Sequence, residues 1–168
     1  MATYFTSFVR FGDRRAALAR GFSSVAMMET AIVMTFEVVA SYDTLFCLGG
    51  LAVDDEAIAR TAALPGRRIL LGEDPNGRYE AAGWMLDPVW PAISIARIDD
   101  RVVLMSQEPY PENESGDPAV PVDMGAPLLC GPLPGDAYDS GRMMSVGFDA
   151  WHGPVPETAV IAWMNGLD

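Results

Sequence analysis

Apolar and polar positions change their spacing twice along the chain and so divide it into three zones. Residues 1–64 contain no proline, and their apolar positions mostly recur with the spacing of helices. Residues 67–107 form short apolar or alternating runs separated by turn residues, which is typical of strands. Residues 108–168 hold nine of the thirteen prolines, which indicates long surface loops.

The first zone predicts one strand and three helices. The aromatic and β-branched run over residues 3–11 favours a strand. Asp13, Ser24 and Asp54 stand just before helical stretches, where a side-chain oxygen can cap the first turn. Residues 31–40 leave a second interpretation open, because their β-branched run also suits a buried strand. The expected helices cover residues 14–19, 24–39 and 56–64.

The second zone predicts an antiparallel sheet. A strand over residues 68–72 and a returning strand over residues 78–86 flank an Asp-Pro-Asn-Gly turn at residues 74–77. Residues 93–106 predict a β-hairpin that turns at Asp99 and Asp100. We expect this hairpin to bury the aliphatic side chains of Ile93, Ile95, Val102 and Leu104.

The third zone mixes loops with short elements. Residues 108–125 are acidic and proline-rich and predict a long surface loop, and residues 127–135 predict an irregular packed segment. Residues 143–151 favour a strand, and residues 158–165 favour a short helix or a strand. We therefore expect one α+β domain over residues 1–168, in which N-terminal helices pack on a mainly antiparallel sheet and long Pro-rich loops lie toward the C-terminus.

The charged residues exclude several kinds of chemistry. All eleven cationic side chains are arginines, and 23 carboxylates bring the net charge to -12. A chain without lysine has neither a Schiff-base lysine nor a phosphate-loop lysine, and this chain also has no glycine-rich nucleotide motif. Because such an acidic surface repels phosphate backbones, we expect no direct nucleic-acid binding. The absence of lysine is typical of coding bias in a high-GC bacterium.

The cysteines and the apolar runs indicate the cellular setting. Cys47 and Cys130 lie in apolar stretches, which favours buried free thiols in a reducing cytoplasm. The most apolar run, residues 25–40, is short and contains two glutamates, so we expect no membrane span. Residues 1–28 are arginine-rich and acid-poor, like a mitochondrial presequence, but a strand and an amphipathic helix in an arginine-biased chain explain the same composition.

Two small constellations could carry catalysis. Cys130, His152 and Asp149 would form a thiol-nucleophile arrangement, but no local signature surrounds the cysteine, and we favour a partly exposed structural histidine. Glu29 and Glu37 stand eight positions apart and would share one face of a helix for acid–base chemistry. We favour the simpler interpretation, in which both are charged positions on the wet side of a helix.

One segment resembles a calcium loop. Residues 112–117, with Asp123 nearby, alternate oxygen-bearing side chains and include a glycine. The helix-flanked twelve-residue pattern is absent and prolines surround the run, which favours a solvated loop. One histidine and two cysteines are too few to predict a zinc site. We therefore expect neither a metal nor a cofactor.

The acidity indicates a basic protein as partner. An acidic domain is steered toward a cationic surface, and exposed aromatic side chains anchor such contacts. In size and charge the chain resembles small acidic bacterial inhibitors, such as toxin-immunity or phage counter-defence proteins. We expect a non-enzymatic protein-binding module that inhibits or neutralises a basic partner; the alternative is a small metal-independent enzyme or ligand-binding domain with an Asp/Glu/Arg/Tyr pocket. The expected contact residues are Glu112, Glu114, Asp117, Trp84, Trp90 and Trp151.

Overall fold

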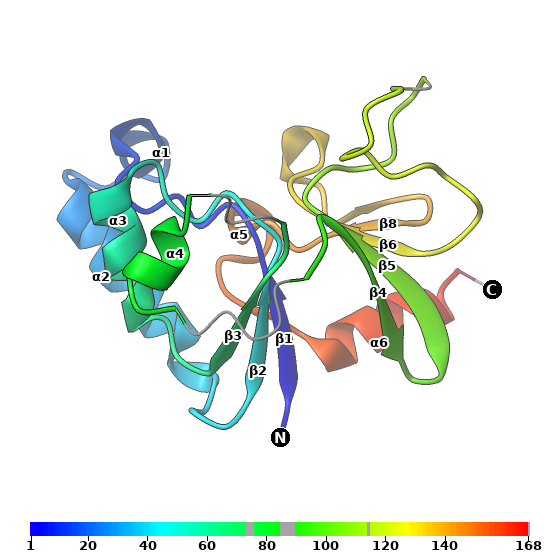
Figure 1. Ribbon diagram of the computed structural model, residues 1–168, viewed down its shortest axis with the longest axis horizontal. Helices are drawn as coiled ribbons and strands as arrows, with labels where there is room; N and C mark the ends of the chain where they lie inside the picture. The colour runs from blue at the N-terminus through cyan, green and yellow to red at the C-terminus, as the bar shows by residue number, and fades with distance from the viewer. Residues whose placement is uncertain (73–75, 85–89, 114, 168) are drawn as a thin grey trace.

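The structure, a computed structural model, describes residues 1–72, 76–84, 90–113 and 115–167. Helices and two mixed β-sheets form an α+β fold, which confirms the expected fold class (Figure 1). The helices are α1 (Arg14–Ala19), α2 (Val25–Thr35), α3 (Asp55–Arg60), α4 (Arg78–Ala81), α5 (Phe148–Trp151) and α6 (Glu157–Asn165), with 3-10 turns at Phe36–Val38, Thr61–Ala63 and Pro134–Asp136. The strands are β1 (Thr3–Thr6), β2 (Thr44–Cys47), β3 (Arg67–Leu70), β4 (Ile93–Ile98), β5 (Arg101–Ser106), β6 (Leu128–Cys130), β7 (Asp139–Ser140), β8 (Met143–Ser145) and β9 (Val155–Pro156).

The first sheet lies beside the N-terminal helices and has the strand order β3-β2-β1-β9 (Figure 1). β1, β2 and β3 run parallel, and β9 is antiparallel to β1. Alternation along β2 sends Leu45 and Cys47 into one core with Met28 and Ile32 of α2, and sends Phe46 to the opposite face. The helices therefore cover one face of this sheet.

The second sheet has the strand order β4-β5-β6-β8-β7, in which β5, β6 and β8 run parallel. Two single bridges join the sheets, one between Ser7 and Gly147 and one between Leu71 and Trp90. Side chains from both sheets meet in a second core with α6, whose Val160 is fully buried. The two sheets thus enclose one shared core, and the first sheet separates it from the helical layer.

The N-terminal helices begin at the expected caps. The side chain of Asp13 accepts hydrogen bonds from the first turn of α1, Ser24 does so for α2, and Asp54 for α3. Helix and 3-10 turn together cover residues 25–38, so the strand alternative for residues 31–40 is wrong. Residues 3–28 form β1, α1 and the start of α2, and are thus part of the folded domain. For residues 158–165, where a short helix or a strand was expected, the structure has the helix α6.

The sheet arrangement corrects several predictions. A mainly antiparallel sheet was expected, but each sheet has three parallel strands. β2 was not predicted, and β6 lies in a segment expected to be irregular. Both are short, and their sequences, Thr-Leu-Phe-Cys and Leu-Leu-Cys, do not alternate apolar with polar residues. Residues 78–81 form α4 rather than a returning strand, and the strand expected over residues 143–151 ends at Ser145, where α5 soon follows. Residues 74, 75, 85 and 86 lie outside the described residues.

The hairpin of β4 and β5 forms as predicted but with its faces reversed. It turns at Asp99 and Asp100, whose φ angles of 48° and 61° are those of a left-handed two-residue turn. The side chains that reach the shared core are Ile98, Val103 and Met105. Of those expected to be buried, Ile95 is 64% and Val102 is 52% exposed, and Ile93 and Leu104 are only partly buried.

Candidate functional site

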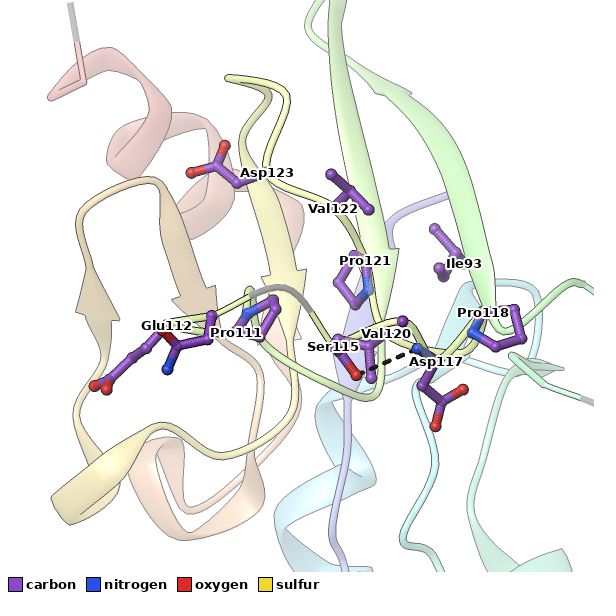
Figure 2. Close-up of a pocket in the computed structure, with 12 residues that line it drawn as sticks. Ile93, Pro111, Glu112, Ser115, Asp117, Pro118, Val120, Pro121, Val122 and Asp123 are labelled. Carbon is purple, nitrogen blue, oxygen red and sulfur yellow. Dashed lines mark hydrogen bonds between the residues drawn. The ribbon is translucent and has the colours of Figure 1, made fainter.

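The long loop over residues 108–125 encloses one side of a groove of about 700 Å³ (Figure 2). The other side is the outer face of β4, which contributes Ile93. Figure 2 shows Ile93, Pro121 and Val122 gathered beside this strand, whereas the carboxylates of Glu112 and Asp117 point away from them. The groove therefore has an apolar floor and acidic margins.

The apolar floor arises where the outer face of the hairpin meets the proline-rich loop. Val122 is 72% exposed, and Ile95 and Val102 extend the aliphatic surface along the hairpin. Contiguous exposed apolar surface of this kind marks sites of interaction. Pro118 lies in a turn that the amide of Val120 closes by donating a 3.1 Å bond to the carbonyl of Asp117. Pro121 follows this turn, and each proline fixes its own φ and removes a backbone donor.

The loop is anchored at both ends. The ring of Tyr110 is buried, and its hydroxyl donates a 3.1 Å hydrogen bond to the carbonyl of Ala126. Burial raises the pKa of the Tyr110 hydroxyl, with a smaller contribution from the nearby Asp123. The Tyr110 bond spans the loop and fixes its two ends beside each other, so its middle projects over β4.

Short side-chain to backbone bonds set the middle of the loop. Asp117 accepts from the amide of Ala119 at 2.9 Å, and Asp123 accepts from the amide of Gly125 at 2.9 Å. The Gly125 bond, followed by the bonds from Arg142, lowers the pKa of Asp123. Both aspartates are therefore held in position.

A smaller pocket of about 360 Å³ lies on the other side of the same loop. It shares Pro111, Glu112 and Asp123 with the groove and adds Tyr110 and Arg142. Arg142 lies 3.2 Å from Asp123. Residues 108–125 themselves contain five carboxylates and no arginine, so the electrostatic field around both pockets is negative.

The structure brings only part of the expected contact set together. Glu112 and Asp117 line the groove, and Glu114 lies outside the described residues. Trp84 as an exposed anchor is wrong: it is 2% exposed and donates a 3.0 Å bond to the hydroxyl of Thr61. The interior of the helical layer encloses this ring, which the sequence could not show.

The other two tryptophans of the expected contact set lie outside the groove. Trp90 is half-buried with its ring edge-on to Phe46 at 5.2 Å. Trp151 is half-buried, and its indole nitrogen donates a 2.8 Å bond to the carbonyl of Ser145. Neither ring lines the groove, so the expected aromatic anchors and the acidic residues do not lie together on one surface.

The thiol-nucleophile arrangement does not form. Cys130 is buried, and burial raises the pKa of its thiol to about 12. Asp149 binds Arg20 through two hydrogen bonds of 2.6 and 2.9 Å. Cys47 is also a buried free thiol with its pKa raised to about 12, so the expected buried thiols are confirmed.

The two glutamates of the acid–base alternative have different surroundings. Glu37 is exposed, whereas Glu29 is buried and accepts bonds from Arg60 at 2.8 and 3.1 Å and from the amide of Gly12 at 2.8 Å. The wet-face interpretation is therefore wrong for Glu29. Its partner Arg60 lies 31 positions away, beyond any helical spacing.

Two further features concern the described part of the chain. Within it, no group of three or more His, Cys, Asp and Glu side chains is placed to hold a metal ion. No helix there combines the length and the apolar character that crossing a bilayer requires.

Known proteins show what this fold resembles. No family model and no curated protein matches the chain. A solved structure, the protein of unknown function AQ665 from Aquifex aeolicus, superposes with a TM-score of 0.69 at 18% sequence identity, covering 96% of this chain and 98% of that one. An identity this low shows a shared fold, and function must be argued from the site.

Proposed function

We propose that this chain is a non-enzymatic module that binds and neutralises a basic protein through the loop of residues 108–125. The observation that carries the proposal is the groove itself: an apolar floor of Ile93 and Val122, rimmed by a loop with five carboxylates and no arginine. We infer an inhibitor of the immunity or counter-defence type that acts in the cytoplasm, a setting supported by two free buried thiols.

The two parts of the groove have separate roles in binding. The exposed carboxylates speed the encounter with a cationic surface, because long-range attraction acts mainly on the association rate. The aliphatic floor accepts an apolar side chain or the methylene stem of an arginine or lysine, and burial of that surface slows dissociation. Salt therefore weakens the first effect and leaves most of the second.

The test measures association and dissociation rates against ionic strength for a basic protein captured at low salt. Charge reversal in the double variant Glu112→Arg/Asp117→Arg should slow association several-fold, on the order of the tenfold effects that charges at an interface rim produce. The matched control, Glu37→Arg/Glu56→Arg, changes the net charge equally on helices far from the groove in sequence; both side chains are exposed. Val122→Ser should instead raise the dissociation rate.

Two results would contradict the proposal. An association rate that is equal at low and high salt would show that electrostatic attraction does not speed the encounter. Equal slowing by the control pair would show that total charge matters and the loop does not.

A further inference from the structure

A second concave site lies between the N-terminal helices and α5 and shares no residue with the groove. This cleft has a volume of about 370 Å³, within the range of about 300–1,000 Å³ that small-molecule sites occupy. Five of its ten lining residues are apolar and five are polar or charged. It is lined by Ala19, Arg20, Phe22, Ala31, Ile32, Thr35, Asp136, Phe148, Asp149 and His152.

Arg20 forms the fixed end of the cleft. Its guanidinium binds both oxygens of Asp149, the carbonyls of Phe8 and Val9, and the sulfur of Met28. These five bonds use all five of its N–H groups, and its side chain is only 10% exposed. Arg20 therefore has no donor left for an anionic ligand, and its role is to hold Asp149 in one position.

The backbone around this cleft is unusually strained. Among the described residues, six that are not glycine have a positive φ, and two of them form the hairpin turn at Asp99 and Asp100. The other four are Phe8 and Arg10, in the segment whose carbonyls Arg20 binds, and Asp136 and His152, which line the cleft. Residues held in such conformations gather at ligand sites, where the surrounding structure fixes them.

The charges of the cleft select the ligand. Arg20 neutralises one of the two carboxylates, which leaves Asp136 exposed and without compensation from any cation that lines the cleft. The side chain of Asp149 is 35% exposed, so its oxygens keep lone pairs accessible. Phe22 and Ala31, which are partly exposed, offer apolar walls beside these groups. A cation with an apolar body complements such a surface, whereas an anion is repelled.

We propose that this cleft binds a small organic cation, a primary amine on an aromatic or aliphatic body. The ammonium group donates hydrogen bonds to the carboxylates of Asp136 and Asp149, and the body packs against Phe22 and Ala31. His152 on the rim contributes a further polar contact through a ring nitrogen. This site is independent of the partner-binding groove, and either function can stand without the other.

The test uses the full chain labelled with ¹⁵N and three probes of similar shape: phenethylamine, the anion 3-phenylpropionate and the neutral alcohol 2-phenylethanol. Phenethylamine should shift the amide resonances of Phe22, Thr35 and His152 with a dissociation constant on the order of 1 mM. The amides of Val120 and Val122 in the groove should stay in place. Binding of the anion as tight as that of the amine would overturn the proposal, and so would shifts spread over other acidic surfaces.

Two variants locate the recognition. Asp136→Asn should weaken amine binding about threefold, as expected for an exposed charge pair, and Phe22→Ala should weaken it through loss of the apolar wall. The matched control is Asp139→Asn, an exposed carboxylate outside the cleft, and its affinity should equal that of the wild type. An unchanged affinity in Asp136→Asn would contradict the assignment of the ammonium site, and Asp136 is exposed, so this variant should fold.

Discussion

The two halves of the molecule use their carboxylates differently. In the first-sheet region, residues 1–72, Glu29 is bound by Arg60, and Asp43 accepts bonds from the amides of Ala2 and Ala40. In the second-sheet region, residues 93–146, Glu112 and Asp117 project from a loop whose floor is aliphatic. Charge in the first region holds distant segments together, and charge in the second is available to a partner.

Apolar side chains are exposed in both regions. In the first-sheet region Met28 and Ile32 of α2 are buried against β2, whereas Met27 and Met34 of the same helix are 56% and 61% exposed. In the second-sheet region the inner face of the hairpin is buried, and its outer face leaves Ile95 and Val102 exposed. Both regions therefore bury one apolar face and expose another, and in the second region the exposed face of the hairpin lies beside the acidic loop.

The largest expected effect comes from the two faces of the hairpin. Val103→Asp places an unpaired charge in the shared core, where Val103 is fully buried, and should cost more than about 4 kcal/mol and abolish cooperative unfolding. Ile95→Asp, on the outer face, should cost less than about 1 kcal/mol. Urea unfolding followed by circular dichroism measures both. Equal losses for the two variants would show that the outer face is covered.

The next largest loss of stability is expected when a hydrogen-bonded carboxylate is removed, compared with removal of an exposed one. Glu29→Ala leaves the guanidinium of Arg60 and the amide of Gly12 without their partner, and should cost about 3 kcal/mol of unfolding free energy. Glu112→Ala should stay within about 0.5 kcal/mol. Adding Arg60→Ala to Glu29→Ala should cost less than the sum of the two single changes. Strict additivity would show that the pair contributes little.

The features that the sequence predicted correctly are those set by residues close together in the chain. Caps at Asp13, Ser24 and Asp54 act within one helical turn, and the hairpin turn at Asp99 and Asp100 acts within two residues, so all were predicted. Both faces of the hairpin are aliphatic, so alternation did not decide which face is buried, and the predicted face was wrong. The packing of α6 against the other face decides the orientation.

The functional features depended on contacts far apart in the chain. Arg20 and Asp149 are 129 positions apart, and no periodicity connects them. The acidic loop was predicted from composition, but its groove required the outer face of β4 to lie beside it. Short strands such as β2, with the sequence Thr-Leu-Phe-Cys, do not alternate apolar with polar residue types, and a prediction of strands depends on that alternation.

A smaller effect should appear on acidification, and it belongs to the first-sheet region. Bonds to the amide of Ala16 lower the pKa of Asp13, and bonds to the amide of Ala2 lower that of Asp43, both from an ordinary value of 3.8. The unfolded chain therefore takes up these protons first, so stability is full above about pH 4 and is lost as the pH falls further. Thermal midpoints at pH 5 and pH 3 measure the loss. Asp43→Asn should lower stability at pH 5 and flatten the dependence; an unchanged slope would contradict the assignment.

The smallest expected effect comes from two buried hydroxyl groups of the first-sheet region, which differ from its bonded carboxylates. The hydroxyl oxygens of Thr6 and Ser7, at the end of β1, are buried and have no hydrogen-bond partner among the described residues. Burying an unpaired hydroxyl is unfavourable, so Thr6→Val, which keeps the shape and removes the polar atom, should leave stability unchanged or raise it by up to about 1 kcal/mol. Thr6→Ala serves as the control, because it also removes a methyl group and should destabilise the protein through a cavity. A clear loss of stability in Thr6→Val would show that this hydroxyl is paired in solution.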